Sequence, residues 1–206
     1  AGFAPFPPQV GDASFGAAMD WTVTTLLDAD AAVRVHVPTD DGLGLTWTEA
    51  GFNDAGWTAG LQAVGFGGRT AEVAATRTDV SIESGDPVME DVNASVYIRI
   101  PFEIADRAAV DTLRMRVRYD DGFVAYINGE LAVEVNVDEP LVWDGDAQRS
   151  HSGASWVFVD ITSAASALVD GTNVLAIHGL NSSRTNSDFF FLTELQAIDI
   201  TAVRIE

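Results

Sequence analysis

Cysteine and lysine are both absent from this chain of 206 residues. Without cysteine, no disulfide can staple the fold and no thiolate can ligate a metal. The 11 basic residues are therefore all arginines, and they stand against 31 acidic residues, for a formal net charge of −20. Nucleic acids and anionic membrane surfaces bind basic surfaces, so this charge argues against both as partners. Divalent cations and neutral or cationic ligands are compatible with it. We attribute most of the acidic excess to solubility in a salty medium.

Long apolar runs and helical patterns are also scarce. No stretch is apolar over the length needed to span a bilayer, so we expect no membrane insertion. The opening "AGFAPFPPQVG" lacks a basic segment followed by an apolar run, so we expect no signal peptide there. Its prolines indicate an N-terminal arm or linker over residues 1–20, followed by one domain over residues 21–206. One short helix is expected near residues 163–169, between a capping Thr162 or Ser163 and Gly171.

Strand patterns fill much of the remaining chain. In "TLRMRVRY" (112–119), Leu, Met, Val and Tyr alternate with arginine, which is the period of a strand with one buried face. Two turn signals follow, Asp121-Gly122 and Asn128-Gly129, each typical of a two-residue hairpin. The pattern predicts a three-strand antiparallel meander over residues 112–137. The arginine stripe on its outer face is expected to pair with carboxylates such as Glu134.

Further strand patterns cover residues 94–104, 155–161, 173–180 and 187–205. The last two are apolar on both faces in places, which suits central strands of a packed sandwich. Many short strands with Asp-Gly and Asn-Gly turns and one small helix indicate an all-β fold, a β-sandwich.

The order of several segments resembles a galactose-binding-like jelly-roll domain. These segments are "FNDAGW" (52–57), "GFG" (65–67), "NASVYIRIPFEI" (93–104), "LRMRVRYDDGFVAYINGE" (113–130), "DITSAASALVDGTNVLAIHGLN" (160–181) and "SDFFFLTEL" (187–195). The chain is similar to the sugar-binding domain of β-galactosidase-type glycoside hydrolases, and to accessory domains of large secreted bacterial proteins. The resemblance implies a jelly-roll β-sandwich, secreted or at the cell surface, with neighbouring domains in a larger chain. It also implies noncatalytic binding, often of carbohydrate, and a structural calcium ion.

Motifs of catalysis are missing. The three histidines lie in different segments, and no HExxH, GxSxG or phosphate-binding loop is present. Asp120 and Asp121 could form a carboxylate pair for glycoside hydrolysis. However, adjacent turn residues point apart, and turn chemistry explains both. We therefore expect no enzymatic activity.

A loop-like insertion, "DEPLVWDGDAQRSHSGAS" (138–155), is the first candidate for ligand binding. It places Trp143 among Asp144, Asp146 and Arg149. An aromatic ring can stack on the apolar face of a pyranose while polar groups bond its hydroxyls. Long loops often carry function. The alternative is that Trp143 folds back to cover the sandwich edge.

The second candidate loop is "HGLNSSRTNSD" (178–188). Asn181, Arg184 and Asp188 offer polar groups between two strands, and arginine is scarce in this chain. Ordinary hydrogen bonding within the loop is the alternative. Together the two loops predict a polysaccharide or glycan site.

The calcium ligands follow only from the resemblance. In such domains the ion joins an early loop to an acid near the C-terminus, which implies Asn53 and Asp54 together with Glu194. Calcium takes six to eight oxygen ligands from carboxylates and carbonyls. The acidic stretch "ESGDPVMEDVN" (83–93) is a rival site, and solvated loop acids are the alternative to both.

These observations predict a noncatalytic carbohydrate-binding accessory domain of a secreted bacterial protein, stabilised by calcium. The alternative from a different class is a structural or adhesive spacer without a glycan ligand. The third hypothesis is that the domain is an enzyme.

Overall fold

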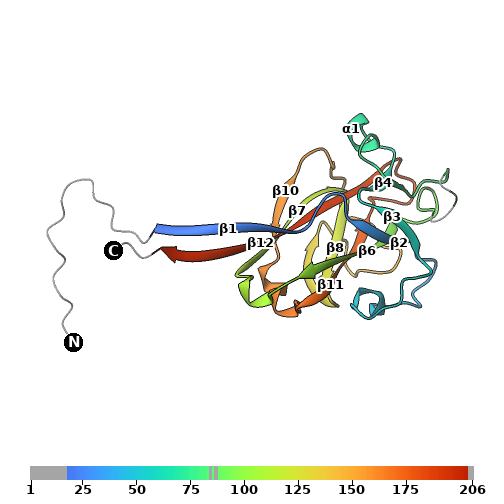
Figure 1. The fold of residues 1–206 in the computed structure, drawn as a ribbon. Coiled ribbons are helices and arrows are strands. Elements are labelled where there is room, and N and C mark those ends of the chain that lie inside the picture. Colours follow the sequence, from blue (N-terminus) through green and yellow to red (C-terminus); the bar gives the residue numbers. More distant parts are fainter. Residues whose placement is uncertain (1–17, 84, 86–87, 204–206) are drawn as a thin grey trace.

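The computed structural model of the chain describes residues 18–83, 85 and 88–203, so most of the expected N-terminal arm lies outside the described residues. Two six-stranded sheets pack face to face, which confirms the all-β sandwich (Figure 1). One sheet has the order β10-β7-β12-β4-β5, with β1 also paired to β12. The other sheet has the order β3-β2-β6-β11-β8-β9. We call them the β12 sheet and the β11 sheet.

The strands range from 2 residues in β5 to 15 residues in β12. Their bounds are β1 Ala18–Leu27, β2 Ala32–His36, β3 Thr58–Leu61, β4 Val64–Phe66, β5 Thr78–Asp79, β6 Ser95–Ile104, β7 Thr112–Asp120, β8 Gly122–Ile127, β9 Glu130–Val135, β10 Val157–Asp160, β11 Gly171–Leu180 and β12 Phe189–Val203. The helices are α1 Thr70–Val73 and three 3-10 turns, η1 Thr46–Thr48, η2 Arg107–Ala109 and η3 Thr162–Ala167. The helix expected near residues 163–169 is thus η3. No described helix is long and apolar enough to cross a membrane.

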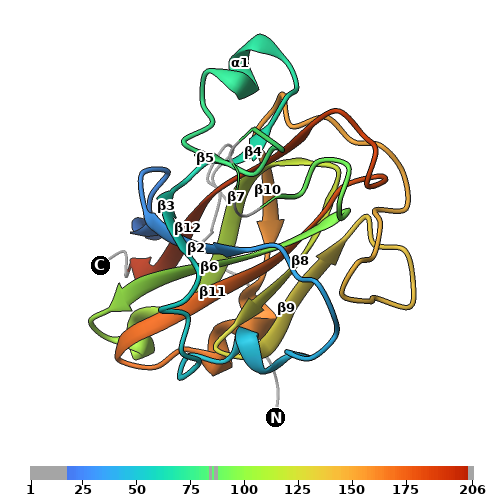
Figure 2. The same ribbon diagram turned by 90° about the vertical axis from the view of Figure 1, so that its right-hand side faces the viewer.

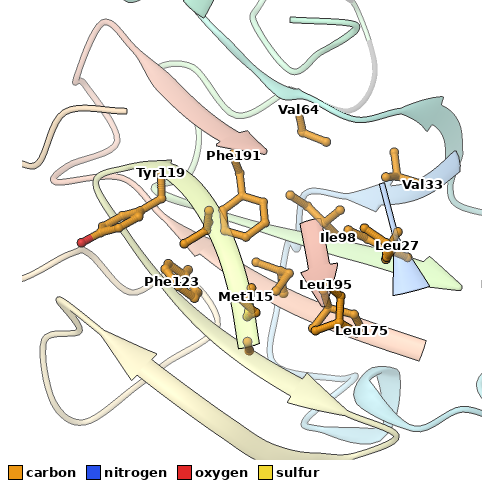
Figure 3. Close-up of a cluster of buried hydrophobic side chains, with 14 of the residues drawn as sticks. Leu27, Val33, Val64, Ile98, Met115, Tyr119, Phe123, Leu175, Phe191 and Leu195 are labelled. Carbon is orange, nitrogen blue, oxygen red and sulfur yellow. The ribbon is translucent and has the colours of Figure 1, made fainter. Parts of the chain in front are cut away.

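The main core lies between the sheets. Alternate residues of facing strands fill it, including Met115 from β7, Phe123 from β8, Ile98 from β6 and Leu195 from β12 (Figure 3). All four are fully buried, which is the strongest stabilising term available to a chain without disulfides.

The predicted meander over residues 112–137 is wrong in its first half. Strand β7 pairs with β10 and β12, whereas β8 pairs with β11 and β9, so the chain crosses between sheets at Asp121. Gly122 does not have a positive φ; a Cβ there would lie 2.7 Å from the carbonyl oxygen of Asn136. "DDG" is therefore a tightly packed corner, of the kind that strands make when they switch sheets.

The second half of the meander is confirmed. Asn128 and Gly129 both have positive φ, 51° and 94°, and Ile127 pairs directly with Glu130. This is the two-residue hairpin that Asn-Gly favours. Because the first turn is a corner, Phe123, Ala125 and Ile127 of β8 face the core, whereas Val124 and Tyr126 face outward.

The arginine stripe of β7 also has different partners from those expected. Arg116 forms a salt bridge with Glu194 at 3.0 Å, and Arg114 donates to Gln196 on the same β12 strand. Glu134 belongs to the β11 sheet, so the predicted pairing with it is wrong.

Candidate ligand-binding site

A second, smaller apolar cluster covers the outer face of the β11 sheet and forms the base of the candidate site. Outward-facing residues of β6, β8 and β11 meet the segment that contains η1. The cluster includes Trp47, Tyr97, Val124, Tyr126, Val174 and Ala176, with Leu141 packed against it. It forms because these strands are apolar on both faces, as expected for central strands.

Trp143 lies at the tip of the loop between β9 and β10. The Gly145 N–H donates to the Val142 carbonyl at 3.0 Å, so Trp143 and Asp144 occupy the central positions of a β-turn. Ala147 anchors the base of this loop by pairing with Val137 and by donating to the Asn181 carbonyl at 2.8 Å. The loop thus presents Trp143 from a fixed turn.

Beneath this turn lies a hollow of about 450 Å³, which we call the aromatic pocket. Its lining residues are Asp41, Gly44, Leu45, Trp47, Tyr97, Leu141, Val142, Trp143, Asp144 and His178. Trp47 and Tyr97 stack with centroids 4.1 Å apart, and His178 meets Tyr97 edge-on at 4.8 Å. Aromatic walls with a few polar groups are typical of small-molecule sites.

One polar atom of this floor has no partner. The indole N–H of Trp47 is buried without an acceptor among the described residues, and Trp47 itself is 1% exposed. A buried donor left unsatisfied costs free energy.

A hydrogen-bonded chain ties the pocket floor to the Trp143 loop. The Ser95 hydroxyl donates to the Gly145 carbonyl at 2.9 Å, so its oxygen accepts from Nε2–H of His178, also at 2.9 Å. Burial lowers the pKa of His178 to about 3, so the ring is neutral. His178 and Ser95 therefore act as structural supports for the loop.

A second hollow, also about 450 Å³, lies on the other side of Trp143, and we call it the Arg184 pocket. Its lining residues are Val92, Asn93, Ala94, Trp143, Asp144, Asp146, Ser183, Arg184 and Thr185. Burial, followed by the charges of Asp144 and Asp138, raises the pKa of Asp146. Trp143 and Asp144 line both hollows, so the indole stands between an aromatic and a polar surface.

The structure thus brings together Trp143, Asp144, Asp146 and Arg184 from the two predicted loops. Asn181 is a correction. It is 1% exposed, its amide donates to the Asp188 carbonyl, and its side-chain oxygen accepts from Ser182 and Asn186. With these groups used internally, Asn181 cannot serve a ligand without breaking the loop.

Arg149 and Asp188 lie elsewhere. Arg149 is exposed but lines neither the aromatic pocket nor the Arg184 pocket. Asp188 lines a separate hollow beside Asp120 and Asp121. The prediction that Arg149 and Asp188 share one site with the other predicted ligand residues is therefore wrong.

The predicted calcium ligands do not meet. Asp54 pairs with Arg99 at 2.7 Å on the outer face of the β11 sheet, and Glu194 pairs with Arg116 on the outer face of the β12 sheet. The sandwich core lies between these faces, so Asn53 and Asp54 cannot share an ion with Glu194. Within the described ranges, no three acidic or histidine side chains are grouped to hold a metal ion. Asp86 of the rival acidic stretch lies outside the described residues.

Sequence reasoning did not identify the pocket floor. Trp47 precedes the recognised segments. His178 alone suggests a residue of the sandwich core; it is buried, but on the outer face of the β11 sheet, where it lines the aromatic pocket. The available signal was alternation: Tyr97 in β6 and His178 in β11 point outward from neighbouring strands and are cross-strand partners.

The comparisons with known proteins show the fold. No family model matches the chain, and no curated protein matches it. Among solved structures, a glycosyl hydrolase family 2 member from Bacteroides cellulosilyticus matches with a TM-score of 0.50 and 13% identity, over 85% of this chain and 20% of that one. A Bacteroides uniformis β-glucuronidase matches with a TM-score of 0.49 and 14% identity, over 86% of this chain and 18% of that one. The chain therefore shares its β-sandwich fold with a part of the glycosyl hydrolase family 2 member, and it spans about a fifth of the length of both chains.

Proposed function

We propose that this chain is a noncatalytic carbohydrate-binding accessory domain of a larger secreted protein. The observation that carries the proposal is Trp143, held on a β-turn between the aromatic pocket and the Arg184 pocket. Both hollows are open at the surface and close to polar side chains. Such a combination fits a ligand with an apolar ring face and many hydroxyls.

Binding would use the two sides of Trp143 differently. A pyranose ring would pack on the indole, and its hydroxyls would bond Asp144 and Asp146 as acceptors and Arg184 as a donor. In the aromatic pocket, the stacked rings of Trp47 and Tyr97 would contact the apolar face of the ligand. One such site buries little area, so we expect an affinity of about 0.1–1 mM for a single unit. A polymer would bind more tightly by multivalency.

The structural alternative is a spacer or adhesive domain without a glycan ligand. The feature that favours it is the paired ribbon of β1 and β12, which projects from the sandwich as far as the pair Ala18 and Val203 (Figure 1). A domain attached through such a ribbon is suited to holding neighbours at a distance. In this reading the half-buried Trp143 only seals the loop.

Affinity electrophoresis on a panel of polysaccharides separates the two functions. We expect at least one polymer to retard the wild type, and Trp143→Ala to lose that retardation. The matched control is Trp21→Ala, because Trp21 is 67% exposed on β1, outside both hollows. Equal retardation of wild type and Trp143→Ala would mean that the site is misplaced. Absence of retardation by every polymer would favour the spacer.

A further inference from the structure

A third hollow, lined mainly by polar and acidic groups, lies at the corner where β7 passes to β8. We call it the acid pocket. Its lining residues are Arg69, Asp120, Asp121, Ser150, His151, Ser152, Asn186 and Asp188, and its volume is about 360 Å³. Figure 2 shows the loops before β10 and before β12 beside one another at this end of the sandwich. None of the acid pocket's residues lines the two pockets beside Trp143.

The Asp121 carboxylate is fully engaged by the surrounding loops. It accepts the N–H of His151 at 2.6 Å, the N–H of Ser182 at 2.7 Å and the side-chain amide of Asn186 at 3.2 Å. Asp121 is 1% exposed. These bonds hold both loops against the corner and account for the shape of the pocket wall without any ligand.

Asp120 is different. It is 7% exposed and lines the pocket, yet its Oδ1 has no hydrogen-bond partner among the described residues. Glu72, which is 2% exposed, likewise has an unpartnered Oε1. Buried carboxylate oxygens are normally satisfied, and each exception calls for an explanation. Asp120 Oδ1 is therefore a buried acceptor that lacks a donor in a residue lining the hollow, whereas Glu72 lies outside that lining.

The charges around Asp120 show which kind of donor is missing. Asp121 and Asp188 act on Asp120 as like charges, and Glu72 acts on Asp188 in the same way. Arg69 at the pocket opposes Asp188, and the Arg118 guanidinium is held at the Gly153 carbonyl. His151 stacks on Tyr119 and donates its main-chain N–H to Asp121. Acidic groups therefore outnumber basic groups here, and an anion would be repelled.

We propose that the acid pocket binds an alkylammonium group, with Asp120 and Asp188 as its acceptors. An ammonium donates three hydrogen bonds and carries the compensating charge, so it supplies both things that the pocket lacks. The hollow is wide enough for an organic group and opens beside Asn186, on the loop that also carries Arg184 to the Trp143 site. The identity of the ligand rests on the proposed function: the ammonium belongs to an amino sugar within the bound glycan.

Binding should be coupled to proton release. Burial, followed by the charge of Asp121, raises the pKa of Asp120 to about 8, so the empty pocket holds a proton there at neutral pH. The ammonium replaces this proton. The affinity for a simple alkylammonium should therefore rise as the pH increases from 6 toward 8.5, since its ammonium stays charged over this range.

The pocket is tested without any glycan. Propylammonium chloride is titrated into the labelled protein, and the amide signals of Ser152 and Asn186 are followed by NMR. 1-Propanol and sodium chloride at matched ionic strength are the reference titrations. We expect saturable shifts with propylammonium only, and a loss of about tenfold in affinity in Asp188→Asn, as for one charge-assisted hydrogen bond. Glu134→Gln, which removes an exposed acid on β9, should bind like the wild type.

Several results would overturn the assignment. Equal shifts with sodium chloride would show only screening of the net charge. Equal weakening by Asp188→Asn and Glu134→Gln would show that the site lies elsewhere. An affinity independent of pH would remove Asp120 from the site.

The amino-sugar part has its own test. A glucosamine oligosaccharide should bind more tightly than its N-acetylated counterpart, and Asp188→Asn should abolish the difference. If propylammonium binds but the two oligosaccharides bind equally, the ammonium does not come from the glycan. If propylammonium binds, but neither these two oligosaccharides nor oligosaccharides with other glycan backbones bind, the proposed function fails while the pocket assignment stands.

Discussion

Asp120→Asn should make the domain more stable at neutral pH and less sensitive to alkali. The variant keeps the size of the side chain, and its amide can donate toward Asp121 as a protonated carboxyl does. It removes the titration of a group whose pKa is raised from 3.8 to about 8, mainly by burial and then by Asp121. A buried acid in a cluster of acids thus becomes a neutral donor.

The sign follows from the direction of the shift. Because the folded protein holds this proton more tightly than the unfolded chain, Asp120 favours folding at low pH. That contribution falls as the pH rises from about 4 and is lost above about 8. Each pH unit in the window is worth at most about 1.4 kcal/mol. Water in the open pocket screens the charges, so we expect a net difference of roughly 2 kcal/mol between variant and wild type at pH 7.5.

The assay is urea unfolding of both proteins at pH 4.5 and pH 7.5. The two should have similar stabilities at pH 4.5, whereas the variant should be more stable at pH 7.5. A gain of that size corresponds to a melting temperature higher by about 4–8 °C for a domain of this length. Glu134→Gln controls for the loss of one negative charge from a chain with a net charge of −20. A variant that is less stable than the wild type at pH 7.5, or one matched by Glu134→Gln, would refute the reasoning about Asp120.

Three further predictions concern the turn, the loop and the ion. Gly129→Val should destabilise the domain by about 1–3 kcal/mol in chemical unfolding, because a β-branched residue resists a φ of 94°; an unchanged stability would contradict the observed hairpin. Ser95→Ala should break the link between His178 and Gly145. Its loss of free energy of glycan binding, measured by electrophoresis, should exceed its loss of free energy of unfolding, measured by thermal unfolding. Because no three acidic or histidine side chains of the described residues are grouped to hold a metal ion, calcium added to chelator-treated protein should raise the melting temperature no more than magnesium does; a larger response to calcium would show a specific site.

The sequence was most informative where local chemistry alone decides the structure. Asn128-Gly129 forms its hairpin because both residues accept positive φ, whatever surrounds them. Asp121-Gly122 carries a similar signal, but distant residues override it. The Asp121 carboxylate is captured by N–H groups of the loops at residues 150–153 and 181–186, and its neighbour packs against Asn136, so the chain turns into the other sheet. No local pattern encodes those partners.

The candidate site shows the same division. Trp143 and Arg184 were recognisable because each is unusual in a polar loop, and the structure places them beside one hollow. Asn181 is an equally polar loop residue, yet its side chain forms its hydrogen bonds within its own loop. Trp47 contributes the pocket floor from a segment about 50 residues before its stacking partner Tyr97. Such contacts depend on which strands lie next to one another in the fold, and a single sequence does not reveal that strand pairing.

The most direct test of glycan recognition uses the indole N–H signals of the five tryptophans as separate reporters. The protein is titrated with fragments of any polysaccharide that retards it, and the five signals are followed by NMR after assignment by single substitutions. The account predicts saturable shifts of Trp143 and Trp47, which line the aromatic pocket, with Trp21 and Trp156 unchanged. Saturable binding that moves Trp156 or Trp21 and leaves Trp143 and Trp47 in place would contradict it.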